Sequence, residues 1–321
     1  LAGKQAQLRN RAERLREKIK QTNYANCKLR QAISIALDYN EYLDVFANGR
    51  GVLAQGPIPP GIFGHKTGPE GTNPFVDRWD PVRKRHARKP METARKLLAE
   101  AVYPKGRDSE GKPLRLFYDH SQSGSAAFRA YYLWQKDRLK LLGINFQERP
   151  TDLSQYRKKR RQGNWQMLTG GWLADYPDPE NFLFLYYGPN SKVKHGGPNV
   201  NNYSNRVFDT LFERMESMTN SPDRLGLIDQ AMGVIRHDAP CVWQYHPVSY
   251  TLYHQWYKNI KPHQMSYNVI KYRRIDEETR ARLQEQWNRP VIWPLILLAS
   301  MAVFAALPGM IKTHRNRKTD S

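Results

Sequence analysis

The sequence predicts an α/β body followed by one C-terminal transmembrane helix. Helical and strand-like patterns alternate between residues 91 and 163, which is typical of an α/β layer. Residues 290–311 carry no charged side chain, although the mean hydropathy of the whole chain is −0.76. A chain of 321 residues with 40% hydrophobic side chains is long enough to bury a core as one large domain or two smaller ones.

The first ninety residues are predicted to hold two helices and a long irregular segment. Residues 6–21 are basic and rich in good helix formers, and residues 29–46 repeat apolar side chains with a helical period. Residues 56–90 are rich in Gly, Pro and charge, which predicts a surface excursion without lasting regular structure.

The α/β layer is predicted from periodicity and from Gly and Pro punctuation. The expected helices are 91–101, 126–142, 152–163, 207–218 and 223–238, and the expected strands are 114–118, 144–149 and a buried strand at 165–172.

The apolar segment 290–311 is long enough to cross a membrane. Its 22 residues span about 33 Å as a helix, against a hydrocarbon core of about 30 Å. Trp287 and Trp293 stand where an interfacial belt is expected, and residues 312–318 add five basic side chains. The positive-inside rule then predicts a single pass through the inner membrane, with the C-terminus cytoplasmic and the body extracytoplasmic.

Such a body needs an export signal. Residues 1–30 contain no apolar signal region and no initiating Met, so the chain is expected to be a processed product or part of a longer one.

Enzyme and cofactor motifs are absent from the sequence. It contains no HExxH, GxGxxG, P-loop or GxSxG pattern, so we expect no enzyme and no cofactor. Asp175, Asp178 and Glu180 could form a calcium or magnesium loop, but two prolines and the lack of a glycine argue against it. We therefore expect no metal.

The two cysteines give little information. Cys241 and His246 lie five residues apart with no second pair, which favours a core thiol and a hydrogen-bonded imidazole over metal ligands. Cys27 and Cys241 could form one bridge in an oxidising compartment, so the redox compartment stays open.

The net charge of +21 points to an acidic partner. Residues 157–161 read RKKRR and residues 83–89 add five positive side chains, but a short charged helix is usually a solvated face. We expect anionic lipid headgroups or an acidic partner subunit, and no nucleic acid.

Aromatic side chains surround Asp175. A carboxylate in such a loop suggests a pocket for a ligand cation, because a desolvated negative charge needs a positive partner. The aromatic residues of this loop are Trp165, Trp172, Tyr176, Phe182, Phe184, Tyr186 and Tyr187.

Motifs spread over about 250 residues carry a family resemblance. They include KLRQAISIALDYNEYLDVFANGRG at 28–51, GPIPPG at 56–61, GNWQMLTGGWLADYPDPENFL at 163–183 and APCVWQYHPVSYTLY at 239–253. The chain resembles the extracytoplasmic solute-binding proteins of ABC importers, in the dipeptide- and oligopeptide-binding family. The resemblance implies a periplasmic-binding-protein-like (type II) lobe with a mixed sheet and surrounding helices.

The resemblance also implies ligand-binding residues. Trp172 and Asp175 match the family's Trp-x-x-Asp element, which lies in the cleft between two lobes and whose Asp pairs with the peptide's free amino group. Gln122 stands about where dipeptide-binding relatives carry an Arg for the ligand carboxylate, so a free dipeptide is not expected. The full expected set is Trp172, Asp175, Tyr176, Asn181, Tyr118 and Gln122.

Two functions from different classes follow. The first is a membrane-anchored solute-binding protein that delivers a peptide-like or cationic small solute to an ABC importer permease. The second is an accessory or structural subunit of a larger membrane complex, built on the same scaffold. The expected division is a leading basic helix and linker (1–27), a solute-binding-protein-like domain with its first lobe largely missing (28–285), a transmembrane helix (286–312) and a basic cytoplasmic tail (313–321).

Overall fold

A computed structural model describes residues 2–121, 125–260 and 269–319 of the chain. Side chains are not described for residues 2–12, 15, 16, 19, 20, 24, 269 and 312–319. The chain forms two compact units, Leu1–Ser249 and Tyr250–Ser321, and each is described by itself. The predicted domain boundaries remain a prediction.

The first helix is longer than predicted. Helix α1 runs without interruption over Ala2–Ala36, so the expected break between residues 21 and 29 is wrong. The intervening residues contain neither Gly nor Pro, and nothing in them stops a helix. The break lies instead inside the single helix predicted over 29–46, so that prediction is also wrong: α1 ends at Ala36 and a second helix, α2 (Tyr39–Phe46), begins. The Asp38 carboxylate accepts from the backbone N–H of Asn40 and caps α2.

A parallel βαβ unit forms the α/β layer. Strands β4 (Arg115–Ser121) and β5 (Asn145–Thr151) pair in parallel over seven residues each, and α5 (Ala126–Lys140) connects them. The helix and both strands confirm the prediction. Helix α6 (Leu153–Gln162) follows, capped by Asp152 at its start and by Gly163 in the left-handed conformation at its end.

The strand expected at 165–172 is reduced to one bridge. Met167 pairs with β4 through two backbone bonds, from its N–H to the carbonyl of Phe117 and from the Asp119 N–H to its own carbonyl. The preceding donor on β4, which would extend the ladder back to Trp165, is taken by a side chain, because the Phe117 N–H bonds to Oε1 of Gln166. The ladder therefore does not extend back to Trp165, and after Met167 the chain continues as a loop through Gly170 and Gly171.

The segment 56–90 is partly ordered and partly buried, so its prediction as a surface excursion is wrong. It contains α3 (Gly68–Gly71) and the antiparallel hairpin β2–β3 (Asp77–Asp80 and Arg85–Arg88). Long-range hydrogen bonds stabilise this segment, whose own sequence favours little regular secondary structure. The Arg236 guanidinium donates to the carbonyls of Gln55 and Gly71, and the buried Gln55 amide bonds to Asp77.

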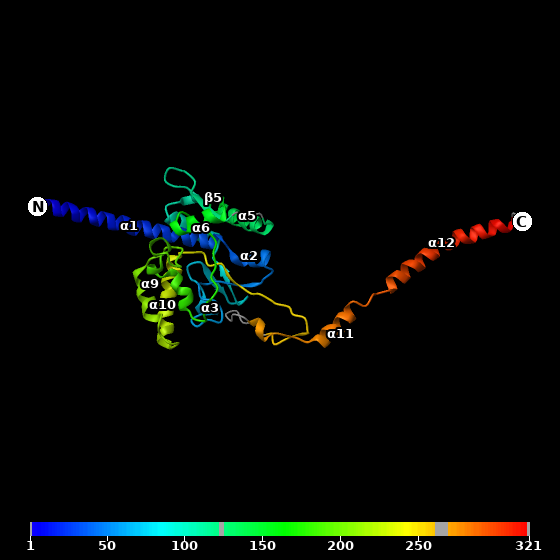
Figure 1. Cartoon of the computed structure of the whole chain (residues 1–321). Coiled ribbons are helices and arrows are strands. Elements are labelled where there is room, and N and C mark those ends of the chain that lie inside the picture. The colour runs from blue at the N-terminus through cyan, green and yellow to red at the C-terminus, as the bar shows by residue number, and fades with distance from the viewer. Residues whose placement is uncertain (1, 122–124, 261–268, 320–321) are drawn as a thin grey trace. The chain divides into compact units, whose positions relative to one another are not determined.

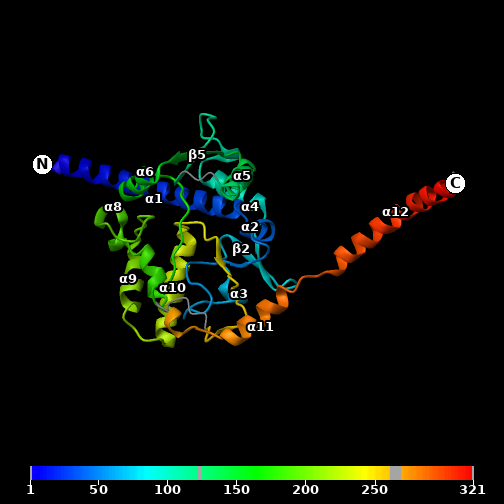
Figure 2. The same cartoon turned by 45° about the vertical axis from the view of Figure 1, so that its right-hand side comes forward.

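Two apolar clusters form the core of the first unit. One joins the C-terminal half of α1 to α4 (Met91–Glu100), α5 and the β4–β5 pair, and the other joins α9 (Arg206–Met215) to α10 (Pro222–Asp238). In Figures 1 and 2, α1 runs between the β4–β5 layer and the α9–α10 pair. Helices α4, α9 and α10 confirm their predictions to within a few residues at each end.

The described strands pair two by two rather than forming one mixed sheet. The β4–β5 pair is parallel, and the other three pairs are antiparallel. The remaining elements of the first unit are β1 (Gly51–Leu53), η1 (Pro104–Gly106), α7 (Glu180–Leu183), η2 (Phe184–Tyr186), η3 (Gly188–Asn190), α8 (Lys192–His195) and β6 (Tyr245–Pro247).

The second unit has a small aromatic cluster. Strands β7 (Tyr257–Lys258) and β8 (Arg274–Ile275) pair, η4 (Val269–Tyr272) precedes β8, and α11 (Glu277–Trp287) follows. The buried Trp256 ring stacks on His254 at 4.2 Å and lies 5.3 Å from Trp287 of α11.

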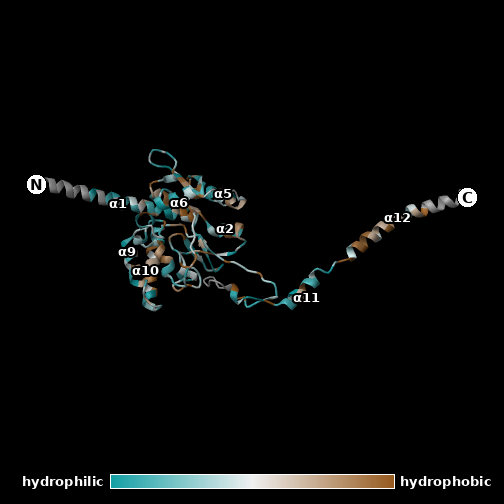
Figure 3. Cartoon of the chain, in the orientation of Figure 1, coloured by the Kyte–Doolittle hydropathy of each residue, from teal (hydrophilic) through white to brown (hydrophobic). Residues whose placement is uncertain are grey.

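Helix α12 (Trp293–Thr319) contains the predicted apolar segment. Its part Trp293–Ile311 is long and apolar enough to cross a membrane, by length and composition, and no side chain there is buried. Figure 3 shows this stretch in brown after the mostly hydrophilic α11. The helix starts at Trp293 rather than 290, with Pro294 in its first turn, where proline is tolerated. The basic side chains expected at 312–318 lie outside the described side chains.

Candidate functional site

The buried amide of Asn181 organises the loop around the predicted ligand residues. Asn181 is 1% exposed, and its Oδ1 accepts from Nε1 of Trp172 at 3.0 Å and from the backbone N–H of Asp175 at 2.9 Å. Its Nδ2 lies 3.5 Å from Oδ2 of Asp175. One amide therefore holds Trp172 and Asp175 at a set separation.

A two-point ion pair anchors the same loop to α10. Arg224, 2% exposed, donates from Nη2 and Nη1 to the two carboxylate oxygens of Asp178 at 2.7 and 2.8 Å, and from Nε to the carbonyl of Met215. Oδ1 of Asp178 also accepts from the Glu180 N–H at the start of α7. Partial burial alone would raise the pKa of Asp178, but the bonds from Arg224 and Glu180 outweigh burial and the pKa lies below its usual value.

The side chains facing water in this loop are aromatic and acidic. Trp172 is 39% exposed and packs edge-on against Phe184 at 5.3 Å, and Asp175 and Tyr176 are also exposed. The Tyr176 hydroxyl donates to the Glu180 carboxylate. Among the side chains that the structure describes, no cation forms an ion pair with Asp175. An exposed carboxylate beside two aromatic faces is suited to a ligand amine.

Tyr118 reaches this loop through a hydroxyl chain. Its buried OH donates to Oγ1 of Thr169 at 2.8 Å, three residues before Trp172. Thr169 also contacts the hydroxyl of Tyr131, which lies 2.8 Å from that of Tyr39. Burial raises the pKa of Tyr118 to about 12, so its phenol stays protonated and serves as a donor at neutral pH.

The structure places the predicted ligand residues unequally. Trp172, Asp175 and Tyr176 share one exposed loop, whereas Asn181 and Tyr118 are buried and position that loop. Gln122 lies outside the described residues. Contact of any of the six with a ligand remains a prediction.

Sequence reasoning missed the anchoring role of Arg224. It lies 46 positions from Asp178, and a single Arg in the first turn of a helix carries no local signal of such a pair. A calcium or magnesium loop at Asp175, Asp178 and Glu180 would need carboxylate oxygens that already have hydrogen-bond partners. Both Asp178 oxygens accept from Arg224, and the Glu180 carboxylate accepts from Tyr176.

The basic run 157–161 is not entirely a solvated face. Lys159 of α6 and Arg149 of β5 both pair with the fully buried carboxylate of Asp119, at 2.8 and 2.5 Å. Arg157, Lys158 and Arg161 are exposed on the same helix.

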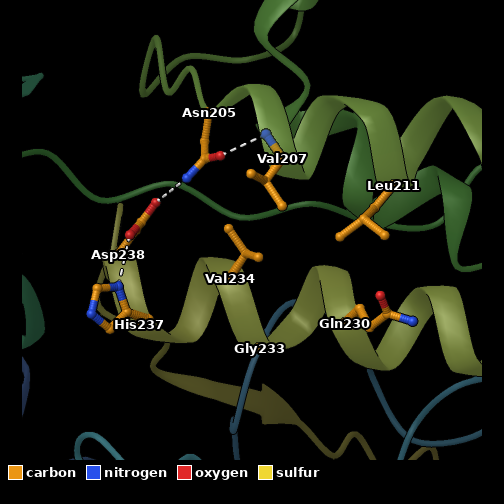
Figure 4. A pocket seen from close by; sticks show the side chains of 8 residues that line it. All are labelled: Asn205, Val207, Leu211, Gln230, Gly233, Val234, His237 and Asp238. Carbon is orange, nitrogen blue, oxygen red and sulfur yellow. Dashed lines mark hydrogen bonds and ion pairs between the residues drawn. The ribbon is translucent and has the colours of Figure 1, made fainter.

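Two cavities among the described residues lie apart from the loop that carries Trp172 and Asp175. One, of about 510 Å³, lies between α9 and α10 (Figure 4), and the other, of about 450 Å³, lies between α4 and the turn at Leu141–Gly143. Neither is lined by a predicted ligand residue.

The fold and the loop define a class of protein. Residues 3–194 match the family model of bacterial extracellular solute-binding proteins, family 5 (middle region). The chain belongs to this family of solute-binding proteins.

Curated relatives agree with this assignment. The chain is 27% identical over 231 residues to heme-binding protein A of Haemophilus influenzae, covering 71% of this chain and 38% of that protein. It is 25% identical over 236 residues to the periplasmic oligopeptide-binding protein OppA of Escherichia coli, covering 73% and 39%. The chain thus spans about two fifths of the length of these relatives.

Solved structures show the same fold. The periplasmic binding protein DppA of Helicobacter pylori, in complex with the peptide STSA, matches with a TM-score of 0.56 at 24% identity, over 70% of this chain and 39% of that one. HbpA2 of Haemophilus parasuis matches with a TM-score of 0.61 at 20% identity, over 78% and 45%. These matches support the predicted type II α/β lobe.

Proposed function

We propose that this chain is the membrane-anchored extracytoplasmic solute-binding protein of an ABC importer, and that it binds a peptide-like or cationic small solute. The observation that carries the proposal is the loop in which Asn181 holds the exposed Trp172 and Asp175 together. Family membership and relatives named as oligopeptide-binding proteins support a peptide-like ligand.

The recognition step follows from charge and geometry. Asp175 is exposed and lacks a described cationic partner, so a ligand ammonium group gains a charge-assisted hydrogen bond there without displacing an existing ion pair. Trp172 and Tyr176 offer aromatic faces beside it for the ligand's apolar part or for a cation–π contact. Selection among ligands then depends on the free amine rather than on the ligand side chains.

The anchoring part of the proposal rests on α12. We infer that its apolar part crosses the inner membrane with the C-terminus in the cytoplasm and the first unit in the periplasm, where an importer permease and anionic lipid headgroups would be its partners. The uncharged run 293–311 supports the span, and the basic residues at 312–318 support a cytoplasmic C-terminus. The exposed basic side chains of α6 support contact with anionic headgroups.

The test compares a free amine with a blocked one. The detergent-solubilised full chain is titrated with trialanine and with N-acetyl-trialanine in a calorimeter. We expect trialanine to bind, and both acetylation and Asp175→Asn to weaken binding more than about tenfold, the loss of a hydrogen bond to a charged group. The matched control is Asp137→Asn, which removes the same charge from an exposed position on α5.

Two outcomes would contradict the proposal. Equal affinity for the two peptides, or an Asp175→Asn variant that binds like the wild type, would remove Asp175 from recognition. Absence of binding together with co-purification in fixed ratio with other membrane subunits would favour the accessory-subunit alternative.

A further inference from the structure

Three side chains of different donor type converge at the end of α10, away from the proposed ligand loop. Among the residues whose side chains are described, Cys27 of α1 and His237 and Asp238 of α10 place one sulfur, one nitrogen and one oxygen within 4.8 Å of one another. Cys27 is buried, Asp238 is partly buried and the His237 side chain is 57% exposed. Nothing in the proposed solute-binding function uses this group.

Neighbouring side chains orient the Asp238 carboxylate and the Cys27 sulfur. Oδ2 of Asp238 accepts from the Tyr203 hydroxyl at 2.7 Å and from the Asn205 amide at 2.8 Å, so Oδ1 is left facing His237 at 2.9 Å. The Gln31 amide lies 3.5 Å from the Cys27 sulfur. Outer hydrogen bonds of this kind orient the ligands of metal sites.

The surroundings also suit a cation. His237 and Asp238 lie at the C-terminal end of the 17-residue α10, where the backbone dipoles favour positive charge, and the Arg30 guanidinium already bonds to the carbonyls of Asp238 and Ala239 there. His237 and Asp238 line the 510 Å³ cavity between α9 and α10. Figure 4 shows Asp238 between His237 and Asn205. The cavity leaves room for water as a further ligand.

We propose that Cys27, His237 and Asp238 form a zinc-binding site with an open fourth position. Zinc accepts sulfur, nitrogen and oxygen donors together and is typically four-coordinate, and three protein ligands plus water is a common arrangement. A Cys27 thiolate and the Asp238 carboxylate balance the two positive charges of the ion.

Binding requires only local changes. The Cys27 thiol now donates to the carbonyl of His237, and on binding it releases its proton to solvent while sulfur bonds to zinc. That carbonyl keeps the hydrogen bond from the Gln31 amide at 2.6 Å. The His237–Asp238 hydrogen bond is replaced by two bonds to the metal. The proton on Nδ1 of His237 moves through solvent to Nε2, so that the neutral imidazole binds zinc through Nδ1. Arg30 stays on the carbonyls of Asp238 and Ala239.

The test titrates the full chain, freed of metal by a chelator, with Zn²⁺ against a chromogenic competitor, and with Co²⁺ as a spectroscopic probe. We expect about one equivalent of Zn²⁺ and a thiolate-to-cobalt charge-transfer band in the near ultraviolet. Cys27→Ser and His237→Gln should each weaken zinc binding by at least about tenfold, since even outer-shell changes in metal sites have effects of that size. Cys27→Ser should also abolish the cobalt band.

Matched controls separate this site from adventitious binding. Cys241→Ser removes the other thiol and His195→Gln an exposed histidine of α8, and neither should change zinc affinity. Far-ultraviolet circular dichroism checks that each variant is folded. Absence of Zn²⁺ binding, an affinity unchanged in Cys27→Ser and His237→Gln, or a cobalt band that depends on Cys241 would overturn the proposal.

Discussion

Arg224 and Asp178 are joined by two parallel hydrogen bonds of 2.7 and 2.8 Å, and this pair connects the loop that carries Trp172 and Asp175 to α10. The guanidinium is almost fully buried, whereas the carboxylate keeps part of its surface in water. The same arginine also bonds to the carbonyl of Met215 in α9 and to Asn220. The candidate site is therefore held by the α9–α10 pair and not by its own loop alone.

Replacing the arginine tests this anchor. Arg224→Met should lower the free energy of unfolding by about 3 kcal/mol, because Asp178 loses its charged partner and Met215 a hydrogen bond. Urea denaturation of the first unit, followed by circular dichroism, measures the change. Arg214→Met removes an exposed arginine of α9 and should change stability by less than about 0.5 kcal/mol. Similar losses in the two variants would contradict the anchoring role.

The same pair predicts an acid dependence. The pKa of Asp178 is lower in the folded protein than in the unfolded chain, so its ion pair contributes stability above about pH 4 and loses that contribution as pH falls through the folded pKa. The melting temperature, measured between pH 7 and pH 2, should decrease as the pH is lowered below about 4. The fall should be shallower in Arg224→Met, and equal slopes in the two proteins would show that Asp178 is not responsible.

Two glycines separate backbone strain from crowding. Gly143 (φ +76°) and Gly111 (φ +79°) both adopt the left-handed conformation, but a Cβ on Gly143 would lie 2.3 Å from the carbonyl oxygen of Lys105. A Cβ on Gly111 would have no atom of the described residues within 4 Å beyond its two chain neighbours. Gly111→Ala should cost about 1 to 2 kcal/mol from conformation alone. Gly143→Ala should cost at least about 2 kcal/mol more, because the clash is with backbone. Chemical denaturation measures both, and equal losses would contradict this contact.

Truncation tests the membrane assignment of α12. A chain ending at Asn288 lacks the apolar part of this helix. It should move from the membrane fraction to the soluble fraction, because the proposed anchor, the exposed apolar side chains of Trp293–Ile311, is then removed. A chain ending at Ile311 keeps that part and should stay with the membrane through a carbonate wash. A soluble Ile311 product, or a membrane-bound Asn288 product, would argue against the assignment.

Local patterns were sufficient for much of the fold. Helix α6 has both its signals within its own sequence, Asp152 at the start and Gly163 at the end, and α12 follows from an uncharged run. The helix and the two strands of the β4–α5–β5 unit were likewise predicted from periodicity, whereas their parallel pairing comes from the structure. Local patterns failed where residues distant in the sequence stabilise the structure. Hydrogen bonds of Gln55 and Arg236 hold part of the segment 56–90 in place, although its sequence predicts a surface excursion.

By itself, then, the sequence determined the helices and strands with local periodicity and caps, the apolar C-terminal helix, and the presence of Trp172 and Asp175 in one aromatic loop. Only the tertiary structure decided that a buried Asn181 joins those two residues, that Arg224 anchors their loop, and that Cys27 meets His237 and Asp238. The physical reason is the sequence separation over which each kind of interaction acts. Caps and periodicity act over a few residues, whereas these contacts depend on how separate helices and loops pack together.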